Sequence, residues 1–226
     1  MRRNMTDGAV RKAWRAIGGQ GLSGLFWAGD MALMLLRANV QLLLSLRAPA
    51  LIFAGRLAVL QGLRHAEIGR YARIARFARI TAWRGGRLRI GRNFSLGESS
   101  IIENGFNIAA MKGVIEIGDN VGIGAFSFIS CPSSVKLGSD CIIGQYFSVH
   151  AQNHVVGGSG LIRHQGTTEQ GVEIGDNCWI GAKVTVLDGV TVGPGCVIAA
   201  GAVVTKSFPA NSVIGGCPAR LIRQIG

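Results

Sequence analysis

The sequence predicts a mainly β fold, a parallel β-helix built from hexapeptide repeats and preceded by an N-terminal α-helical segment. Large aliphatic residues recur every six positions over most of the chain from residue 68 onward. Hydrophobic residues make up 48% of the chain and charged residues only 16%, so we expect a packed core rather than disorder. An apolar, arginine-rich stretch precedes the repeats.

Residues 1–66 form this predicted N-terminal segment. We expect two helices in it, over about 24–47 and 50–66, separated at Pro49 because proline interrupts a helix. Charged side chains break the apolar run before it reaches the roughly 18 uncharged residues of a membrane-spanning helix. A signal peptide also fits poorly, because the first apolar block is glycine-rich and contains an acid. The interrupting residues are Asp30, Arg37, Arg47 and Arg56.

The excess positive charge lies in the first part of the chain. Residues 1–95 hold 17 Lys and Arg against three Asp and Glu, a net +14, and residues 96–226 hold seven against nine, a net −2. This asymmetry indicates a polyanion or an anionic membrane surface as a partner of the N-terminal segment. Helices lying in the plane of a bilayer are one interpretation; packing on the rest of the protein or on a neighbouring subunit is the other. No recognised nucleic-acid motif accompanies the arginines, so we expect no nucleic-acid partner.

Residues 67–226 form the predicted β-helix domain. Its units include "IGRYAR" from Ile68, "IGDNVG" from Ile117 and "IGAKVT" from Ile180. Six residues make a short strand and a turn, and three such sides make one coil of a triangular prism with the aliphatic side chains stacked on its axis. The fifth position of a unit is often small, and we expect the cysteines there to fill the core rather than form disulfides. They are Cys141, Cys178 and Cys196.

The repeat breaks off at "SVHAQNH", residues 148–154, and resumes at Ile174. We expect residues 155–173 to leave the prism as an extended loop, and loops on rigid scaffolds are where sites are built. His154 lies at the root of this loop. From position alone, a solvated histidine beside a tolerated insertion explains it equally well.

The "NH" at 153–154, the loop and the stretch from "IGDNCWIGAKVTVLDGV" to "GGCPARLIRQI" resemble the C-terminal core of the hexapeptide-repeat acetyltransferases. This family includes galactoside, maltose and virginiamycin-type O-acetyltransferases and many enzymes that act on polysaccharides. The resemblance is continuous over about 137–225, and upstream to residue 68 it is only the repeat. It implies a left-handed parallel β-helix, a homotrimer, and acetyl-CoA as co-substrate in a groove between neighbouring prisms.

The resemblance also implies roles for individual residues. His154 matches the catalytic histidine and would take the proton from the attacking hydroxyl, without a covalent intermediate. For coenzyme A, Trp179 matches a tryptophan near the pantetheine arm, and Ala182 and Ala200 match positions whose backbone binds the thioester oxygen and the pantetheine amides. Ordinary packing is the alternative for the tryptophan. Three basic residues match positions near the nucleotide phosphates, with a solvated surface as their alternative: Lys206, Arg220 and Arg223.

The acceptor side is less specified by the family pattern. Asn153 and His150 are expected to orient His154 or contact the sugar, and His164 and Arg163 to close over the acceptor from the loop. Arginines also recur every third residue on the first predicted coil, which predicts two columns of positive charge suited to the phosphates of a lipid-linked acceptor. These are Arg70, Arg73, Arg76 and Arg79.

Together these observations predict a cytoplasmic, homotrimeric O-acetyltransferase acting on a sugar hydroxyl of a polysaccharide, lipopolysaccharide or lipid-linked glycan precursor. Its N-terminal segment is a candidate for holding it on the inner face of the membrane. The alternatives are N-acetylation of an amino sugar nucleotide, serine acetylation, and a non-enzymatic scaffold. Zinc hydration needs three histidines at a spacing that the sequence does not show, so we expect no metal.

Overall fold

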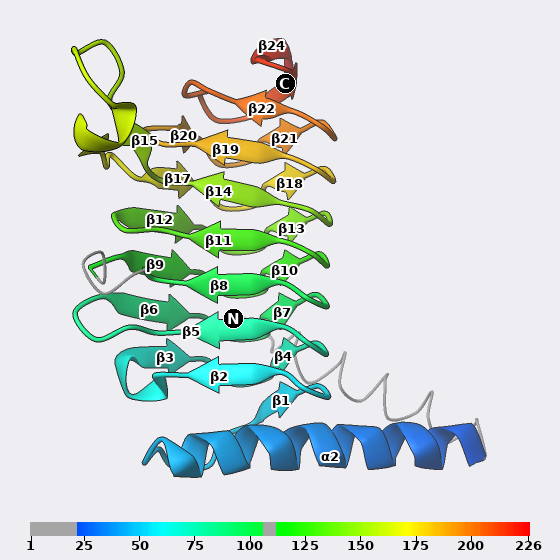
Figure 1. Ribbon diagram of the computed structural model, residues 1–226. Coiled ribbons are helices and arrows are strands. Elements are labelled where there is room, and N and C mark those ends of the chain that lie inside the picture. Colours follow the sequence, from blue (N-terminus) through cyan, green and yellow to red (C-terminus); the bar gives the residue numbers. More distant parts are fainter. Residues whose placement is uncertain (1–21, 106–111) are drawn as a thin grey trace, which may run out of the picture.

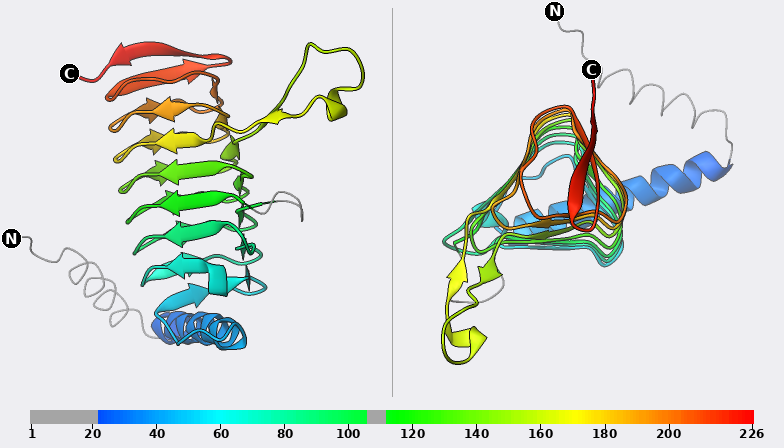
Figure 2. Two further views of the ribbon diagram at one scale, coloured as in Figure 1. Left: turned by 90° about the vertical axis from the view of Figure 1, so that its left-hand side faces the viewer. Right: turned by 90° about the horizontal axis from the view of Figure 1, so that it is seen from above.

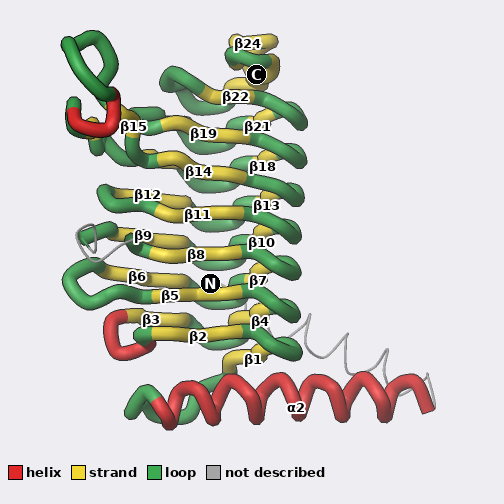
Figure 3. Tube along the Cα trace, in the orientation of Figure 1, coloured by secondary structure: helices red, strands yellow, loops and turns green. Residues whose placement is uncertain are grey.

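The computed structural model describes residues 22–105 and 112–226 of the chain, which wind into a three-sided prism (Figures 1 and 2). Helix α2 (Leu22–Leu44) lies across one end of the prism, and the C-terminal hairpin lies at the other end. Each side of the prism is a sheet, and turns and loops form the corners (Figure 3). The predicted β-helix of hexapeptide repeats is confirmed.

The three sheets contain nine, seven and six strands. Sheet A holds, in spatial order, β1 (Ile52–Ala54), β4 (Ala72–Ile74), β7 (Ser95–Leu96), β10 (Gly122–Ile123), β13 (Ile142–Ile143), β18 (Trp179–Ile180), β21 (Val197–Ile198), β23 (Ser212–Gly216) and β24 (Ala219–Gln224). Sheet B holds β2 (Val59–Gln61), β5 (Arg79–Thr81), β8 (Ile101–Glu103), β11 (Phe128–Ser130), β14 (Ser148–His150), β19 (Thr185–Leu187) and β22 (Val203–Val204). Sheet C holds β3 (Ala66–Ile68), β6 (Arg87–Ile90), β9 (Val114–Ile117), β12 (Ser134–Leu137), β17 (Val172–Ile174) and β20 (Thr191–Val192).

Stacked aliphatic side chains form the core. Apart from the antiparallel pair β23 and β24, neighbouring strands of the three sheets pair in parallel with their equivalents in the next coil. The registers Ile123 with Ile143, Ile143 with Ile180 and Ile180 with Ile198 place these side chains in one column. All four are at most 3% exposed. Because the repeat keeps every inward position aligned with the next, the prism has one continuous hydrophobic core along its axis.

The cysteines of the repeats fill the core as predicted. The three in the fifth position are at most 2% exposed, and each thiol donates to a backbone carbonyl of the following coil. The acceptors are Gly175 O for Cys141 (3.3 Å), Gly193 O for Cys178 (3.4 Å) and Pro209 O for Cys196 (3.2 Å). A small side chain with a weak donor therefore fits each of these inward positions.

The first predicted helix is confirmed as α2, but the second one, over 50–66, is wrong. These residues contain β1, β2 and the 3₁₀ turn η1 (Leu63–His65). Ile52 pairs with Ala72 and Leu60 with Ile80, so the stretch repeats the inward positions of the next coil. Gly55 supports this stacking, because a Cβ there would lie 2.6 Å from the backbone nitrogen of Arg76. The strands therefore begin at Ile52 rather than at residue 67.

Helix α2 closes the open edge of the first coil. The side chain of Gln41 replaces a strand partner: its Nε2 donates to Ala58 O (3.1 Å), and the backbone N–H of Leu60 donates to its Oε1 (2.7 Å). Asn39 does the same for Ala50, donating to its carbonyl (3.2 Å) and accepting from its N–H (2.8 Å). An unpaired edge strand invites association with another chain, so this capping favours a closed end.

Replacing Gln41 by leucine is expected to lower the free energy of unfolding by about 1–3 kcal/mol, because Leu60 N–H and Ala58 O lose their partners. Urea or thermal unfolding followed by circular dichroism measures this. Gln145→Leu is the matched control, since Gln145 is exposed at a prism corner. Equal midpoints for the two variants would show that the cap contributes nothing.

The predicted arginine columns are wrong. Arg73 lies on β4 in sheet A and Arg79 on β5 in sheet B, and Arg76 lies between these strands at the corner. A step of three residues moves around the coil rather than along the prism, and the neighbours of Arg79 in adjacent coils are Val59 and Ile101. Two of the four also pair with carboxylates: Arg76 with Glu98 (2.7 Å) and Arg79 with Glu103 (3.4 Å).

Candidate active site

A two-stranded arm leaves the prism at the corner between sheets B and C (Figures 1 and 2). We define the arm as residues 152–171. Its root is the antiparallel pair β15 (Asn153–His154) and β16 (Thr167–Thr168), in which Asn153 lies opposite Thr168 and His154 opposite Thr167. The side chains of Asn153 and His154 are exposed, so His154 is available to a reactant from solvent or from another subunit.

Asp188 anchors the returning strand of the arm. Its Oδ1 accepts from the backbone N–H of Gln170 (2.9 Å) and Gly171 (2.8 Å), and its Oδ2 accepts from the hydroxyl of Thr168 (3.3 Å). Sequence reasoning missed this residue. The only signal was the turn-forming dipeptide "DG" at 188–189, which gives no hint of a partner outside the turn.

Near its tip, the arm is held by one glutamine. Gln165 Oε1 accepts from Gly158 N–H (3.0 Å), and its Nε2 donates to Gly158 O (3.3 Å) and Gly160 O (3.2 Å). The turn η3 (Ile162–His164) lies in the same region and places Arg163 and His164 at the surface, nine and ten residues of chain from His154, respectively. Aliphatic side chains of the arm are exposed as well: Val155, Val156, Leu161 and Ile162.

Removing the Asp188 anchor is expected to open the arm. In Asp188→Ala, cleavage by trypsin after Arg163 should become about 5–30-fold faster, which corresponds to losing one or two kcal/mol of local stability. Asp188→Asn keeps an oxygen for the two backbone N–H groups and is expected to be cleaved nearly as slowly as the wild type. Mass spectrometry of a cleavage time course distinguishes the three proteins; equal rates would show that the anchor is dispensable.

His150 faces outward from β14, on sheet B beside the root of the arm. Its Nε2 lies 2.8 Å from the hydroxyl oxygen of Ser148, two residues earlier on the same face. Ser148 was not among the predicted site residues. Since alternate residues of a strand point to the same side, any outward Ser-x-His on a strand can make this contact.

Trp179 lies on a different side of the prism from the arm. It is 60% exposed on β18 in sheet A, where it pairs with the 68% exposed Ile142 and with Val197. His154 leaves the corner between the other two sheets. A single chain therefore does not bring His154 and Trp179 together.

The backbone N–H groups of Ala182 and Ala200 have no acceptor within the described residues. The preceding residue in each case does have an acceptor: Gly181 N–H donates to Ile198 O (2.8 Å), and Ala199 N–H donates to Ile214 O (2.8 Å). The carbonyl of Ala182 accepts from Gly201 (2.8 Å), which stacks the two alanines in consecutive coils. Ala182 and Ala200 lie at the corner between sheets A and B. Their two amides, one from each of two consecutive coils, are thus available to a carbonyl-rich ligand extended along this corner.

The three predicted phosphate-binding residues are exposed at the C-terminal end of the prism. Arg220 and Arg223 lie on β24, where each guanidinium donates to a backbone carbonyl close by in sequence, Ala219 O (3.0 Å) and Gln224 O (3.3 Å). The ammonium of Lys206 lies 5.6 Å from the centre of the Phe208 ring. None of the three pairs with a carboxylate in the described part of the chain.

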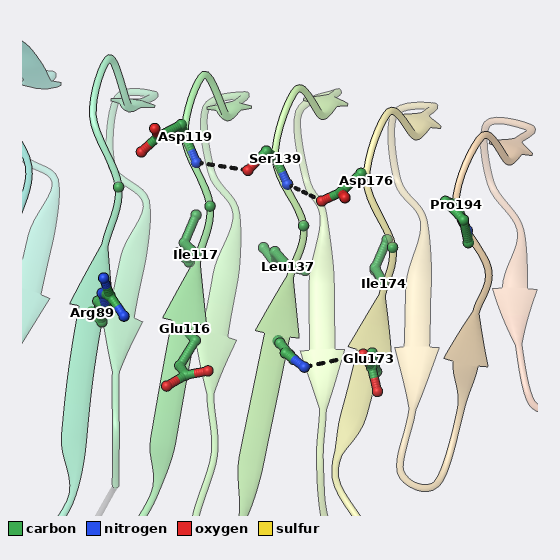
Figure 4. Close-up of a pocket in the computed structure, with 15 residues that line it drawn as sticks. Arg89, Glu116, Ile117, Asp119, Leu137, Ser139, Glu173, Ile174, Asp176 and Pro194 are labelled. Atoms are coloured by element: carbon green, nitrogen blue, oxygen red, sulfur yellow. Dashed lines mark hydrogen bonds and ion pairs between the residues drawn. The ribbon is translucent and has the colours of Figure 1, made fainter.

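A groove of about 510 Å³ lies where sheet C meets sheet A and contains none of the predicted site residues (Figure 4). Its polar groups connect each coil of the prism to the next. Asp119 N–H donates to Ser139 Oγ (3.1 Å), Ser139 N–H donates to Asp176 Oδ1 (2.6 Å), and Lys136 pairs with Glu173 (3.4 Å). These contacts follow the prism axis, and we assign the groove no ligand.

No cluster of three potential metal ligands and no helix with the length and hydropathy to cross a membrane occur within residues 22–105 and 112–226.

Two family models match the chain. Residues 171–206 match the bacterial transferase hexapeptide (six repeats), and residues 114–144 match the hexapeptide repeat of succinyl-transferase. Both matches lie in the prism, and the first contains Trp179, Ala182 and Ala200.

Curated relatives extend this likeness. The putative lipopolysaccharide biosynthesis O-acetyl transferase WbbJ of Escherichia coli is 32% identical over an alignment of 152 residues that covers 62% of this chain and 72% of WbbJ. A probable acetyltransferase of Mycobacterium tuberculosis is 31% identical over 139 residues, which are 61% of this chain and 44% of that protein. The chain thus spans less than half the length of the mycobacterial relative.

A solved structure shares the fold. The hexapeptide-repeat acetyltransferase VCA0836 of Vibrio cholerae, complexed with acetyl coenzyme A, is 25% identical with a TM-score of 0.53, over 61% of this chain and 70% of that one. The expected left-handed parallel β-helix is thereby confirmed.

Proposed function

The chain belongs to the hexapeptide-repeat acetyltransferases, and from that premise we propose that it is an acetyl-CoA-dependent O-acetyltransferase acting on a sugar hydroxyl. The acceptor class is a precursor of a polysaccharide, a lipopolysaccharide or a lipid-linked glycan, which the likeness to WbbJ supports. One observation carries the proposal: His154 stands exposed at the hydrogen-bonded root of the arm, where the "NH" of the family pattern occurs.

In the proposed reaction, the imidazole of His154 takes the proton of the sugar hydroxyl as its oxygen bonds to the acetyl carbonyl carbon. Backbone N–H groups stabilise the negative charge that develops on the carbonyl oxygen, and Ala182 supplies one of them. The carbon–sulfur bond then breaks, and the histidine returns the proton to the departing thiolate. The transfer is direct and needs no acyl-enzyme.

The complete site is proposed to lie between two protomers of a homotrimer. His154 and Trp179 occupy different sides of one prism, so a second copy is needed to bring such residues together. The arm presents four exposed aliphatic side chains, which is what a contact with a neighbouring subunit requires. In the trimer, the arm of one protomer would lie against sheet A of the next, close to Trp179.

Coenzyme A is proposed to extend along the corner between sheets A and B. The available amides of Ala182 and Ala200 would bind the carbonyl oxygens of the acetyl-pantetheine arm. Its phosphates would lie toward Lys206, Arg220 and Arg223, at the end of the prism where these cations are exposed. On the acceptor side, Asn153, His150, Arg163 and His164 stay candidates for sugar contacts.

The test uses acetyl-CoA labelled in its acetyl group. The full chain is incubated with a lipid-linked oligosaccharide, a neutral nucleotide sugar, an amino sugar nucleotide or serine. If the sugar becomes labelled and mild alkali releases the label, the acetyl group is bound as an O-ester, which supports the proposal. Alkali-stable label on the amino sugar would indicate an N-acetyltransferase, and label on serine would indicate serine acetylation. No transfer and no calorimetric binding of acetyl-CoA would indicate a scaffold.

A further inference from the structure

Helix α2 carries an apolar stripe on the side that faces away from the prism. Its members repeat at helical spacing and are 46–80% exposed: Leu33, Leu36, Val40, Leu43 and Leu44. The opposite side of the helix packs on the first coil, with Ala38 and Leu42 at most 5% exposed. One helix therefore has two apolar sides, and within residues 22–105 and 112–226 only one of them is buried against the prism.

The rotation of α2 about its axis is fixed. Asn39 and Gln41 are hydrogen-bonded to the backbone of Ala50, Ala58 and Leu60, and these bonds replace the missing strand partners of the first coil. Turning the helix to bury the stripe would break all of them. The stripe is thus held on the exposed side of α2, and α2 lies across the end of the prism (Figures 1 and 2).

Arginines predominate in the part of the chain that carries the stripe. The described residues 22–95 include 12 arginines and two acids, Asp30 and Glu67, and three of these arginines pair with acids of later coils, which leaves a net charge of +7. Arg37 lies on α2, and two more arginines meet at its C-terminal end: Arg47 donates to Leu63 O (3.4 Å) and Arg64 to Ser45 O (3.3 Å). Residues 1–21 add five further basic residues and one acid.

We propose that the stripe and the arginines around it form a docking surface for an anionic phospholipid bilayer, with α2 lying in the plane of the headgroups. An apolar helix side flanked by arginines is the arrangement that interfacial helices use. Two copies of the chain meeting end to end would bring together two surfaces of net positive charge, which disfavours a self-contact. A nucleic acid would attract the arginines but leave the aliphatic side chains without a partner.

The experiment is flotation of the full chain with vesicles, without acetyl donor or acceptor, so its result is independent of the proposed reaction. We expect binding to vesicles of phosphatidylcholine and phosphatidylglycerol in equal parts, weaker binding to phosphatidylcholine alone, and loss of binding at high salt. The double variant Leu36→Glu/Val40→Glu is expected to reduce the bound fraction at least about tenfold.

The matched control is Phe77→Glu/Phe126→Glu. It adds the same charge at two side chains that are each 51% exposed but lie at a prism corner, and it is expected to float like the wild type. Circular dichroism checks that both variants stay folded. Absence of wild-type binding to anionic vesicles, or undiminished binding by the α2 variant, would overturn the proposal. A fall in sedimentation mass specific to the α2 variant would identify a second copy as the partner instead.

Discussion

Replacing His154 by alanine is expected to lower kcat for acetyl transfer by about 10²–10⁴-fold, because the hydroxyl loses the base that takes its proton. The KM for acetyl-CoA should change little, since His154 lies on the arm and the proposed coenzyme contacts lie on the prism. Steady-state kinetics with labelled acetyl-CoA measure both constants. Added imidazole is expected to restore part of the activity of His154→Ala and to leave the wild type unchanged.

The other three histidines provide the controls for this prediction. His65 is exposed at the opposite end of the prism, in η1, and His65→Ala is expected to keep full activity. His150→Ala and His164→Ala should show smaller losses than His154→Ala, because they are placed to support the base or contact the acceptor. If His150→Ala alone abolished transfer, the base would have to be reassigned to the histidine beside Ser148.

Mixing two inactive variants is expected to restore activity. Each variant expressed alone is expected to have a transfer rate near zero. Co-expression of His154→Ala with Trp179→Ala in equal amounts should give about one quarter of the wild-type rate. In the proposed shared site, the histidine comes from one protomer and the tryptophan from the next. Random assortment of the two variants therefore leaves both residues intact at one site out of four. The measurement is the specific activity of the total co-expressed protein, and two different affinity tags show on a separate sample that both variants occur in one particle.

The control replaces the second partner by the double variant His154→Ala/Trp179→Ala, which contains no residue able to complement the first. No recovery is expected from that mixture. Should the single-variant mixture also stay inactive, although both tags are present in one particle, each site would have to be built within one chain.

The repeat made most of the fold predictable. Six-residue spacing specifies which side chains point inward, and Ile123, Ile143 and Ile180 stack as that spacing requires. The same rule placed Cys141 and Cys178 in the core. These are local properties of each unit, so a single sequence suffices to show them.

Residues 50–66 were mistaken for a helix because their composition hides the repeat. The stretch "LIFAGRLAVL" is apolar and contains arginine, as an amphipathic helix would, and the small inward residue Ala58 is not distinctive. The parallel pairing with the next coil, Ile52 with Ala72 and Leu60 with Ile80, shows that these residues form strands. That pairing depends on residues 20 positions apart along the chain.

The candidate site was only partly predictable for the same reason. The position of His154 followed from the break in the repeat, but Asp188, which anchors the arm, lies a coil away and contacts the arm through two backbone N–H groups and one hydroxyl. Backbone contacts leave no pattern in the partner's side chains. The separation of Trp179 from His154 around the prism is likewise a property of the winding, which spacing along the chain does not reveal.

The stacking of coils also determines how far His154 lies from α2 along the prism axis. From β1, beside α2, to β13, in the coil from which the arm departs, sheet A advances by four strand spacings, or about 19 Å. Adding the helix diameter of about 10 Å raises the imidazole roughly 30 Å above whatever surface α2 rests on. If α2 rests on a membrane, the number of coils would therefore set the distance between the proposed base and the lipid. A sugar attached directly to a lipid headgroup would fall short of His154, whereas the outer residues of a longer chain would reach it, so acetylation would select by distance from the anchor.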